Sequence, residues 1–231
     1  MTATAPRRGI RSFVVRAGRL TAAQQRALTE LWPAYGLAWP PPAVPIQSSW
    51  IFNRIAPLTV EIGFGNGTTL AALATANPGR DYLGIEVHQP GIGHLLLAAE
   101  ASDLKNLRII AHDAVEVLAQ AIAPCSVDEI LVQFPDPWPK KRHHKRRLIQ
   151  PEFATLAASR LRTGGMLRLA TDWEAYALHM QDVLNACPLL RNLAADGGPV
   201  PRPTWRQLTK FEQRGHRLGH GVWDFEFSRQ D

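Results

Sequence analysis

Strand-like and helix-like segments alternate through most of this chain, and that alternation constrains its fold more than any other feature. The successive pairs are 58–62 with 68–76, 82–87 with 92–101, 107–111 with 114–122, 129–134 with a helix from 151 to about 161, and 166–171 with a helix from 173 to about 186. Repeated βα units of this length predict an α/β fold with a doubly wound, mostly parallel sheet. The tail 222–227 alternates apolar and polar residues, which predicts an antiparallel strand near an edge of that sheet.

The N-terminal part of the chain predicts an appendage to this sheet. Thr21 and Gln24 have the spacing of a capping box at the start of a short helix. The proline-rich stretch 40–45 cannot continue a helix and predicts a stiff connector. We therefore expect a basic arm, a short helix and a connector in residues 1–50, and the main domain in residues 51–231.

The charge of the chain is concentrated in one place. The 231 residues are 45% hydrophobic, enough for a large core, and carry 26 basic against 20 acidic side chains. The block Lys140–Arg147 contains six of those basic residues and no acid, so the remaining charges balance at 20 against 20. A local run of this kind favours a polyanionic partner, and a solvated loop is the alternative.

Composition also bears on location. Cys125 and Cys187 show no metal-binding spacing and are expected to stay reduced. The sequence has no signal-peptide core and no apolar stretch of about 20 residues, so we expect an intracellular, cytoplasmic protein without a membrane span. Residues 1–29 hold six arginines and no acid, as a transit peptide does, but proline and glycines interrupt any continuous amphipathic helix there.

A glycine-rich turn, 63–67, follows the first strand and opens the next helix. Gly63 and Gly65 would let a ligand approach the backbone, although glycines also serve any tight turn. A dinucleotide would place its pyrophosphate here, where the carboxylate of Glu61 would repel it. S-adenosylmethionine carries a sulfonium and an ammonium group and no phosphate, so Glu61 favours that cofactor.

Two more acidic residues follow the next two strands. Glu86 closes the second strand, where a carboxylate can accept hydrogen bonds from ribose hydroxyls. Asp113 follows the third strand, where it could meet an adenine ring or could instead cap the helix ahead of Glu116. Acids after three strands that share one sheet edge predict a site for S-adenosylmethionine.

The segment 134–139, Phe-Pro-Asp-Pro-Trp-Pro, follows an apolar strand and precedes the basic block. Its Asp136 emerges at a strand's carboxyl end, where open α/β sheets bind ligands. We expect Asp136 at the catalytic centre; if the acceptor is a guanine N7, which has a free lone pair and no proton to remove, its role is electrostatic rather than that of a strong base. Trp138 is a candidate stacking platform for an unstacked base, or it packs beneath the loop as core.

Other polar residues are expected to meet a nucleic-acid substrate. Asp172 and Glu212 could accept hydrogen bonds from a guanine, although Asp172 could simply cap a helix. Lys140 lies nearest to Asp136 and could contact the substrate directly. The expected contacts to the RNA backbone are Lys141, Arg142, His143, His144, Lys145, Arg146 and Arg147.

The chain closely resembles the tRNA (guanine-N7-)-methyltransferase family in its bacterial single-chain form. The most specific matches are Phe134–Trp138 with the basic residues after it, Ala170–Trp173 and Thr209–Glu212, and the similarity extends from Arg11 to Asp224. It departs at Asn66, where many members carry methionine, and at Pro139, where many carry histidine. The resemblance implies a Rossmann-like class I methyltransferase that methylates a guanosine in the variable loop of tRNA, with no obligatory protein partner predicted. It further implies cofactor contacts at Glu61, Glu86, Asp113 and Asp136, and substrate contacts at Lys140, Asp172, Thr209, Lys210, Phe211 and Glu212.

Three alternatives remain open from the residues alone. A nicotinamide dehydrogenase shares the sheet and the glycine turn but has no use for Glu61 or the basic block. A non-catalytic RNA-binding module would use the basic block equally well. A methyltransferase acting on an adenine amino group would differ only in its acceptor atom.

Overall fold

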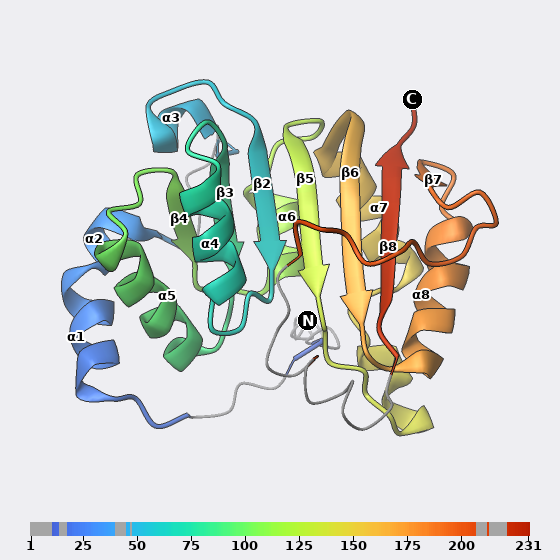
Figure 1. The fold of residues 1–231 in the computed structure, drawn as a ribbon, viewed down its shortest axis with the longest axis horizontal. Coiled ribbons are helices and arrows are strands. Elements are labelled where there is room, and N and C mark those ends of the chain that lie inside the picture. Colours follow the sequence, from blue (N-terminus) through green and yellow to red (C-terminus); the bar gives the residue numbers. More distant parts are fainter. Residues whose placement is uncertain (1–10, 14–17, 40–44, 47, 207–211, 213–220) are drawn as a thin grey trace, which may run out of the picture.

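One eight-stranded sheet, in the order β1-β4-β3-β2-β5-β6-β8-β7, runs through the computed structural model, which describes residues 11–13, 18–39, 45–46, 48–206, 212 and 221–231 (Figure 1). The strands are β1 (Gly36–Leu37), β2 (Leu58–Ile62), β3 (Asp81–Ile85), β4 (Leu107–Ile110), β5 (Val127–Gln133), β6 (Leu161–Thr171), β7 (Leu190–Asn192) and β8 (Trp223–Arg229). All neighbouring pairs from β1 to β6 are parallel, whereas β8 is antiparallel to both β6 and β7. The predicted doubly wound, mostly parallel sheet with an antiparallel strand near its edge is confirmed.

Helices cover both faces of this sheet (Figure 1). They are α1 (Ala22–Glu30), α2 (Trp32–Tyr35), α3 (Ser48–Phe52), α4 (Thr68–Ala76), α5 (Gln89–Ala101), α6 (Ala114–Gln120), α7 (Pro151–Arg160) and α8 (Glu174–Asn185). Residues of α1, α2, α4 and α5 share one apolar core with the sheet, and residues of α6, α7 and α8 share the other. Every residue of β2 and β3 is buried, as expected for parallel strands that are covered on both faces.

The N-terminal helix forms as predicted and packs on the domain. Thr21 Oγ1 accepts a hydrogen bond from the Gln24 backbone N–H at 3.2 Å, and Gln24 Oε1 accepts one from the Thr21 N–H at 2.9 Å. The hydroxyl of Tyr35 donates to the carbonyl of Ala99 in α5 at 3.2 Å. Helices α1 and α2, which precede the predicted boundary near residue 50, thus pack against the domain, and the boundary itself stays a prediction.

Several bounds differ from those predicted. Strand β6 begins at Leu161 rather than Met166, and its pairing with β5 shifts register between Val127 and Glu129. The two shortest strands, β1 and β7, were not predicted, because two and three residues are too few to show the apolar pattern of a strand. The basic block forms a short 3-10 helix, η1 (Lys141–Arg146), which its charge pattern did not indicate.

The order of the strands fixes where a ligand can bind. The chain builds outward from β2 to β3 and β4, and then returns to place β5 on the other side of β2. Such a reversal leaves a crevice at the carboxyl ends of the central strands. Among the described helices, none is both long and apolar enough to cross a membrane.

Candidate functional site

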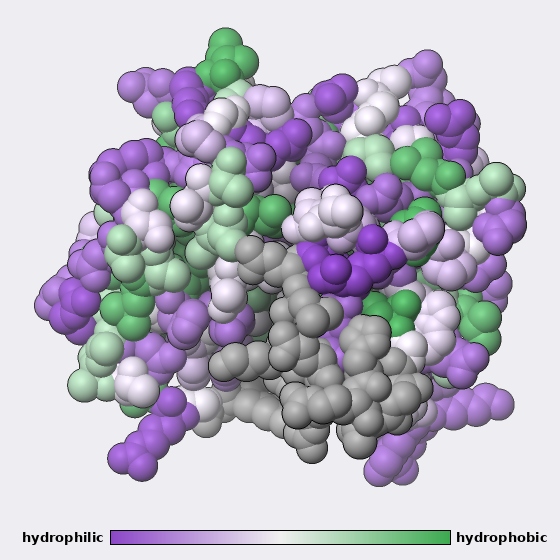
Figure 2. All heavy atoms as spheres, in the orientation of Figure 1, coloured by the Kyte–Doolittle hydropathy of each residue, from purple (hydrophilic) through white to green (hydrophobic). Residues whose placement is uncertain are grey.

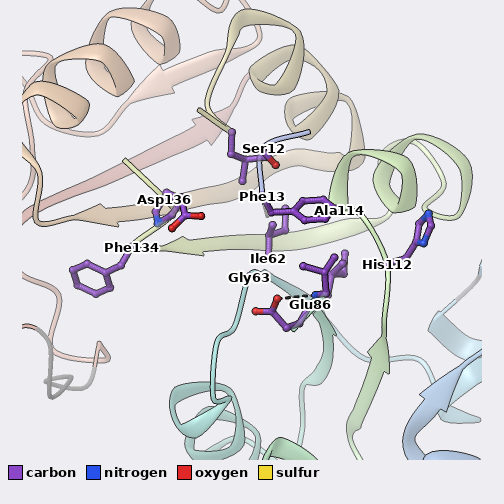
Figure 3. Close-up of a pocket in the computed structure, with 13 residues that line it drawn as sticks. Ser12, Phe13, Ile62, Gly63, Glu86, His112, Ala114, Phe134 and Asp136 are labelled. Atoms are coloured by element: carbon purple, nitrogen blue, oxygen red, sulfur yellow. Dashed lines mark hydrogen bonds between the residues drawn. The ribbon is translucent and has the colours of Figure 1, made fainter. Parts of the chain in front are cut away.

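A cavity of about 200 Å³ lies at the carboxyl ends of β2, β3, β4 and β5. Its wall includes residues that follow four different strands (Figure 3). They are Ile62 and Gly63 at the end of β2, Glu86 after β3, Ala114 after β4 and Asp136 after β5. The cavity therefore sits at the reversal of strand order. It brings together three of the residues predicted from the sequence, Gly63, Glu86 and Asp136.

The glycine turn after β2 leaves open space on the side of the cavity. Gly63 and Gly65 have φ values of 68° and 60°, in the left-handed region that favours glycine. A Cβ atom added at either position would meet no atom within 4 Å. A ligand can therefore approach this backbone closely.

Glu86 holds the glycine turn in place. One carboxylate oxygen, Oε2, accepts a hydrogen bond from the Gly65 N–H at 2.9 Å. The other, Oε1, accepts from the N–H groups of Val87 and His88 at 2.7 and 3.0 Å. A carboxylate offers about four lone-pair positions and three donors are present, so Glu86, which lies in the cavity wall, still has acceptor capacity.

Glu61 is a buried carboxyl that lacks a full set of partners. Its side chain is 3% exposed, Gln133 Nε2 donates to Oε1 at 3.3 Å, and Oε2 has no hydrogen-bond partner among the described residues. Burial, and secondarily the negative charge of Glu86, raises the pKa of Glu61 to about 8. A cationic ligand beside Glu61 would favour its charged form, whereas a pyrophosphate would not.

The third predicted acid has a structural role in this arrangement. Asp113 is the N-cap of α6 and accepts a hydrogen bond from the Val115 N–H at 2.9 Å, so the capping alternative is confirmed. Its neighbour His112, which the sequence did not single out, lies in the cavity wall and stacks on Trp39 with ring centroids 4.1 Å apart. A contact between Asp113 and an adenine ring stays a prediction.

The loop that carries Asp136 has an unusual backbone. Phe134 and Trp138 have φ values of 51° and 45°, a region that bulky side chains rarely adopt. Three hydrogen bonds hold this segment: the Phe134 N–H donates to the Ala170 carbonyl at 2.8 Å, Arg147 Nε to the Pro137 carbonyl at 2.9 Å, and Trp138 Nε1 to the Ser12 carbonyl at 3.0 Å. Asp136 itself is exposed and points toward the cavity (Figure 3).

Trp138 is half-buried and does not belong to the apolar core. The guanidinium of Arg146 lies 5.1 Å from the centre of its ring, and the ring of His143 meets it edge-on at 5.8 Å. A base that stacked on Trp138 would have to take the opposite face or replace Arg146.

The basic block is not uniformly exposed. Lys140, Lys141, Arg142 and Lys145 are exposed, and His143, His144 and Arg146 are half-buried. Arg147 differs from all of them, because its side chain is 3% exposed and its guanidinium donates to backbone carbonyls. In this structure the Arg147 side chain bonds to other parts of the protein and is not exposed at the surface for a phosphate.

The remaining predicted substrate residues lie in two regions. Asp172 is half-buried and does not cap α8, whose N-cap residue Trp173 instead donates its backbone N–H to Thr171 Oγ1 at 3.3 Å. Glu212 is buried, and its carboxylate accepts hydrogen bonds from Arg206 at 2.6 and 2.8 Å. Thr209, Lys210 and Phe211 lie outside the described residues.

Three residues of the cavity wall were not predicted from the sequence as site residues. Ser12 and Phe13 form part of the cavity wall from the N-terminal segment, and Phe134 forms another part (Figure 3). Phe134 begins the segment that carries Asp136, and its place in that segment was the signal for it. Nothing local to Ser12 or Phe13 signals a contact with residues more than a hundred positions away.

A second cavity, of about 280 Å³, lies toward the amino ends of β3, β5 and β6. Hydrophilic residues gather over the middle of the face of the molecule that Figure 2 shows. The arginines in its wall are paired with carboxylates, Arg80 and Arg168 with Glu129, and Arg162 with Asp128. Because these charges compensate one another, the first cavity is the better candidate site.

Known proteins resemble this chain in sequence over nearly its full length. Residues 55–225 match a family described as "Putative methyltransferase". A protein of Methylococcus capsulatus named tRNA (guanine-N(7)-)-methyltransferase is 56% identical over 229 residues, which cover 99% of this chain and 97% of that protein. A protein of Klebsiella pneumoniae with the same name is 52% identical and is covered over 93% of its length.

Solved structures resemble the fold. The 16S rRNA methyltransferase KamB superposes with a TM-score of 0.54 at 16% identity, over 79% of this chain and 92% of that one. A 16S rRNA (adenine(1408)-N(1))-methyltransferase from Catenulisporales acidiphilia, solved with its cosubstrate S-adenosylmethionine, gives 0.55 at 16% identity, over 80% and 90%. These likenesses show that the chain shares its fold with these methyltransferases.

Proposed function

Because the chain belongs to the tRNA (guanine-N7-)-methyltransferase family and uses S-adenosylmethionine as methyl donor, we propose that it methylates N7 of a guanosine in the variable loop of tRNA. The observation that carries this proposal is the position of Asp136. Its exposed carboxylate lies in the wall of the cavity, in a loop that leads directly into exposed basic residues.

The residues around the cavity fit the cofactor. S-adenosylmethionine supplies a methyl group activated by a sulfonium. Glu61 is not itself in the cavity wall but directly precedes Ile62 and Gly63, which are; its Oε2, without a hydrogen-bond partner among the described residues, suits a positive group of the ligand. The open space beside Gly63 and Gly65 suits a close approach of the ligand. Glu86 retains acceptor capacity for ribose hydroxyls, and Asp113 is proposed to contact the adenine from the start of α6.

Asp136 has an electrostatic task in this proposal. A guanine N7 carries a lone pair and no proton, so its attack on the methyl group requires placement rather than a strong base. Asp136 would orient the flipped base and balance the positive charge that the base gains. Lys140, exposed beside this loop, and Asp172 are proposed to contact the same nucleoside.

The backbone of the RNA is assigned to the exposed side of the basic block. Flipping a guanosine out of folded tRNA costs a few kcal/mol, and stacking on an aromatic ring such as Trp138 returns about 1–3 kcal/mol. Phosphate contacts from Lys141, Arg142 and Lys145 supply the remainder. A cytoplasmic location and activity without a protein partner stay predictions.

Replacing Asp136 tests the proposed mechanism. Asp136→Ala and Asp136→Asn should bind tRNA as the wild type does and lose most of their methyl-transfer rate, measured in single turnover with methyl-labelled S-adenosylmethionine. Asp172→Asn tests the second carboxylate in the same way. Near-normal transfer by Asp136→Ala with unchanged tRNA binding would refute the role of Asp136.

A further inference from the structure

Arg147 is the one member of the basic block Lys140–Arg147 that the structure buries. Its Nε donates to the carbonyl of Pro137 at 2.9 Å and its Nη1 to the carbonyl of Ala175 at 3.3 Å. Its Nη2 lies 3.2 Å from His144 Nε2, and its guanidinium carbon lies 4.8 Å from the centre of the Tyr176 ring. A phosphate could reach this group only if the loop moved.

The two carbonyls belong to segments that carry the two proposed substrate carboxylates. Pro137 directly follows Asp136, and Ala175 lies in the first turn of α8, shortly after Asp172. A guanidinium is a rigid planar fork, so one group that bonds both carbonyls fixes the separation of the two segments. A lysine ammonium on a flexible stem cannot hold both in the same way.

The Asp136 loop requires such an anchor. The left-handed backbone of Phe134 and Trp138 costs free energy and persists only when surrounding contacts impose it. Pro135 and Pro137 have no N–H to donate, so the loop has fewer backbone donors, and the Pro137 carbonyl is one of its points of attachment.

The Tyr176 ring, against which the Arg147 guanidinium packs, is held in place by its own contacts. The ring of Tyr176 is fully buried, and its hydroxyl accepts a hydrogen bond from the Ile149 N–H at 3.1 Å. The Ile149 carbonyl lies 2.8 Å from His179 Nε2 in α8. Arg147 therefore connects a rigid part of the domain to a strained loop.

We propose that Arg147 is a positioning residue for methyl transfer, which holds the Asp136 loop and the start of α8 in one frame, and not a phosphate contact. This inference rests on the proposed function of the site. It separates Arg147 from its sequence neighbours Lys141, Arg142 and Lys145, whose exposed side chains remain available to RNA.

The test compares Arg147→Met and Arg147→Lys with the wild type. The readouts are the single-turnover rate at saturating tRNA and S-adenosylmethionine, the salt dependence of the tRNA dissociation constant, and the melting temperature. Both variants should keep the wild-type salt dependence while the rate falls by about 10- to 100-fold, because small misplacements of reacting groups cost that much. Arg147→Lys should retain more of the rate than Arg147→Met, since its ammonium can still reach one of the two carbonyls, whereas methionine can reach neither.

Two controls frame this result. Lys145→Met, on the exposed side of η1, should lower the slope of log Kd against log salt by about 0.7–0.9. Arg191→Met, at an exposed position in β7, should change neither slope nor rate.

Three outcomes would overturn the inference: a reduced salt slope with an unchanged saturating rate in Arg147→Met, a full rate in Arg147→Lys, or a lower melting temperature with an unchanged rate per folded molecule. If Arg147→Met fails to fold, the rate of Arg147→Lys decides. A wild-type enzyme that forms no 7-methylguanosine would instead contradict the proposed function.

Discussion

The carboxylate of Glu86 joins the glycine turn to the end of β3, because its Oε2 accepts a hydrogen bond from the Gly65 N–H at 2.9 Å. The Gly65 carbonyl, in turn, faces α5 at Gly91. The wall of the cavity proposed to bind the cofactor thus depends on how closely α5 approaches this turn.

Gly91→Ala tests that dependence. A Cβ at residue 91 would lie 1.9 Å from the Gly65 carbonyl oxygen, so the backbone of the turn has to shift. Overpacking of this kind costs about 1–3 kcal/mol, which corresponds to about a 5- to 150-fold weaker affinity for S-adenosylmethionine if the strain falls on the turn. Calorimetric titration measures this affinity. Gly79→Ala is the matched control, since a Cβ there meets no atom within 4 Å, and equal affinities for the two variants would contradict the account.

The buried Glu61 predicts that cofactor binding depends on pH. Burial first, and the charge of Glu86 second, raise the pKa of Glu61 to about 8, so the free enzyme holds this carboxyl protonated at neutral pH. A cationic ligand favours the charged form and lowers that pKa, so binding releases a proton and tightens as pH rises toward 8.

Calorimetry between pH 5.5 and 7.5, in buffers with different ionisation enthalpies, measures the released proton. This window lies below the ordinary pKa of the cofactor's own α-amino group, about 7.7–8.0. Glu61→Gln should abolish the proton release that the wild type shows. Identical proton release in both proteins would mean that Glu61 does not face the cation.

The exposed side of the basic block predicts a salt effect. Neutralising Lys141, Arg142 and Lys145 together should reduce the slope of log Kd for tRNA against log salt by about 2–3, since each phosphate contact contributes about 0.7–0.9. Filter binding over a salt series measures the slope. An unchanged slope would mean that these residues of the basic block do not contact the phosphates of tRNA.

The buried ion pairs of Arg206 lead us to expect that replacing this residue lowers the stability of the protein strongly. Its guanidinium is 1% exposed and donates to both oxygens of Asp224, at 2.6 and 2.9 Å, and to both oxygens of Glu212. Arg206→Met leaves two carboxylates buried without this partner, which should lower the free energy of unfolding by about 3–5 kcal/mol in urea titrations. Adding Glu212→Gln and Asp224→Asn should recover part of the loss. The exposed pair of Arg26 and Glu30 is the control, and Arg26→Met should change stability little.

The alternation of strand-like and helix-like segments in the sequence was sufficient to predict the fold. An apolar run such as 130–132 needs burial on both faces, and the helices between successive strands force a parallel arrangement, so local pattern and long-range packing agree. The same logic placed Gly63, Glu86 and Asp136 at one edge of the sheet, where the cavity lies.

Contacts between distant segments could not be predicted in this way. The alternation in β8 placed Asp224 among polar, half-exposed positions, but Asp224 is buried and accepts hydrogen bonds from Arg206. A run of basic residues likewise does not indicate which one turns inward, as Arg147 does. The approach of Ser12 and Phe13 to Asp136 depends on the path of a whole segment, for which the sequence has no local signal.

The most direct test of the proposed function is the identity of the methylated atom. The enzyme is incubated with an unmodified tRNA transcript and methyl-labelled S-adenosylmethionine, and the digested nucleosides and mapped fragments are then analysed by mass spectrometry. We expect the label in 7-methylguanosine at one position in the variable loop. Label on an adenine, on another guanine atom, or in no nucleoside at all would contradict the assignment.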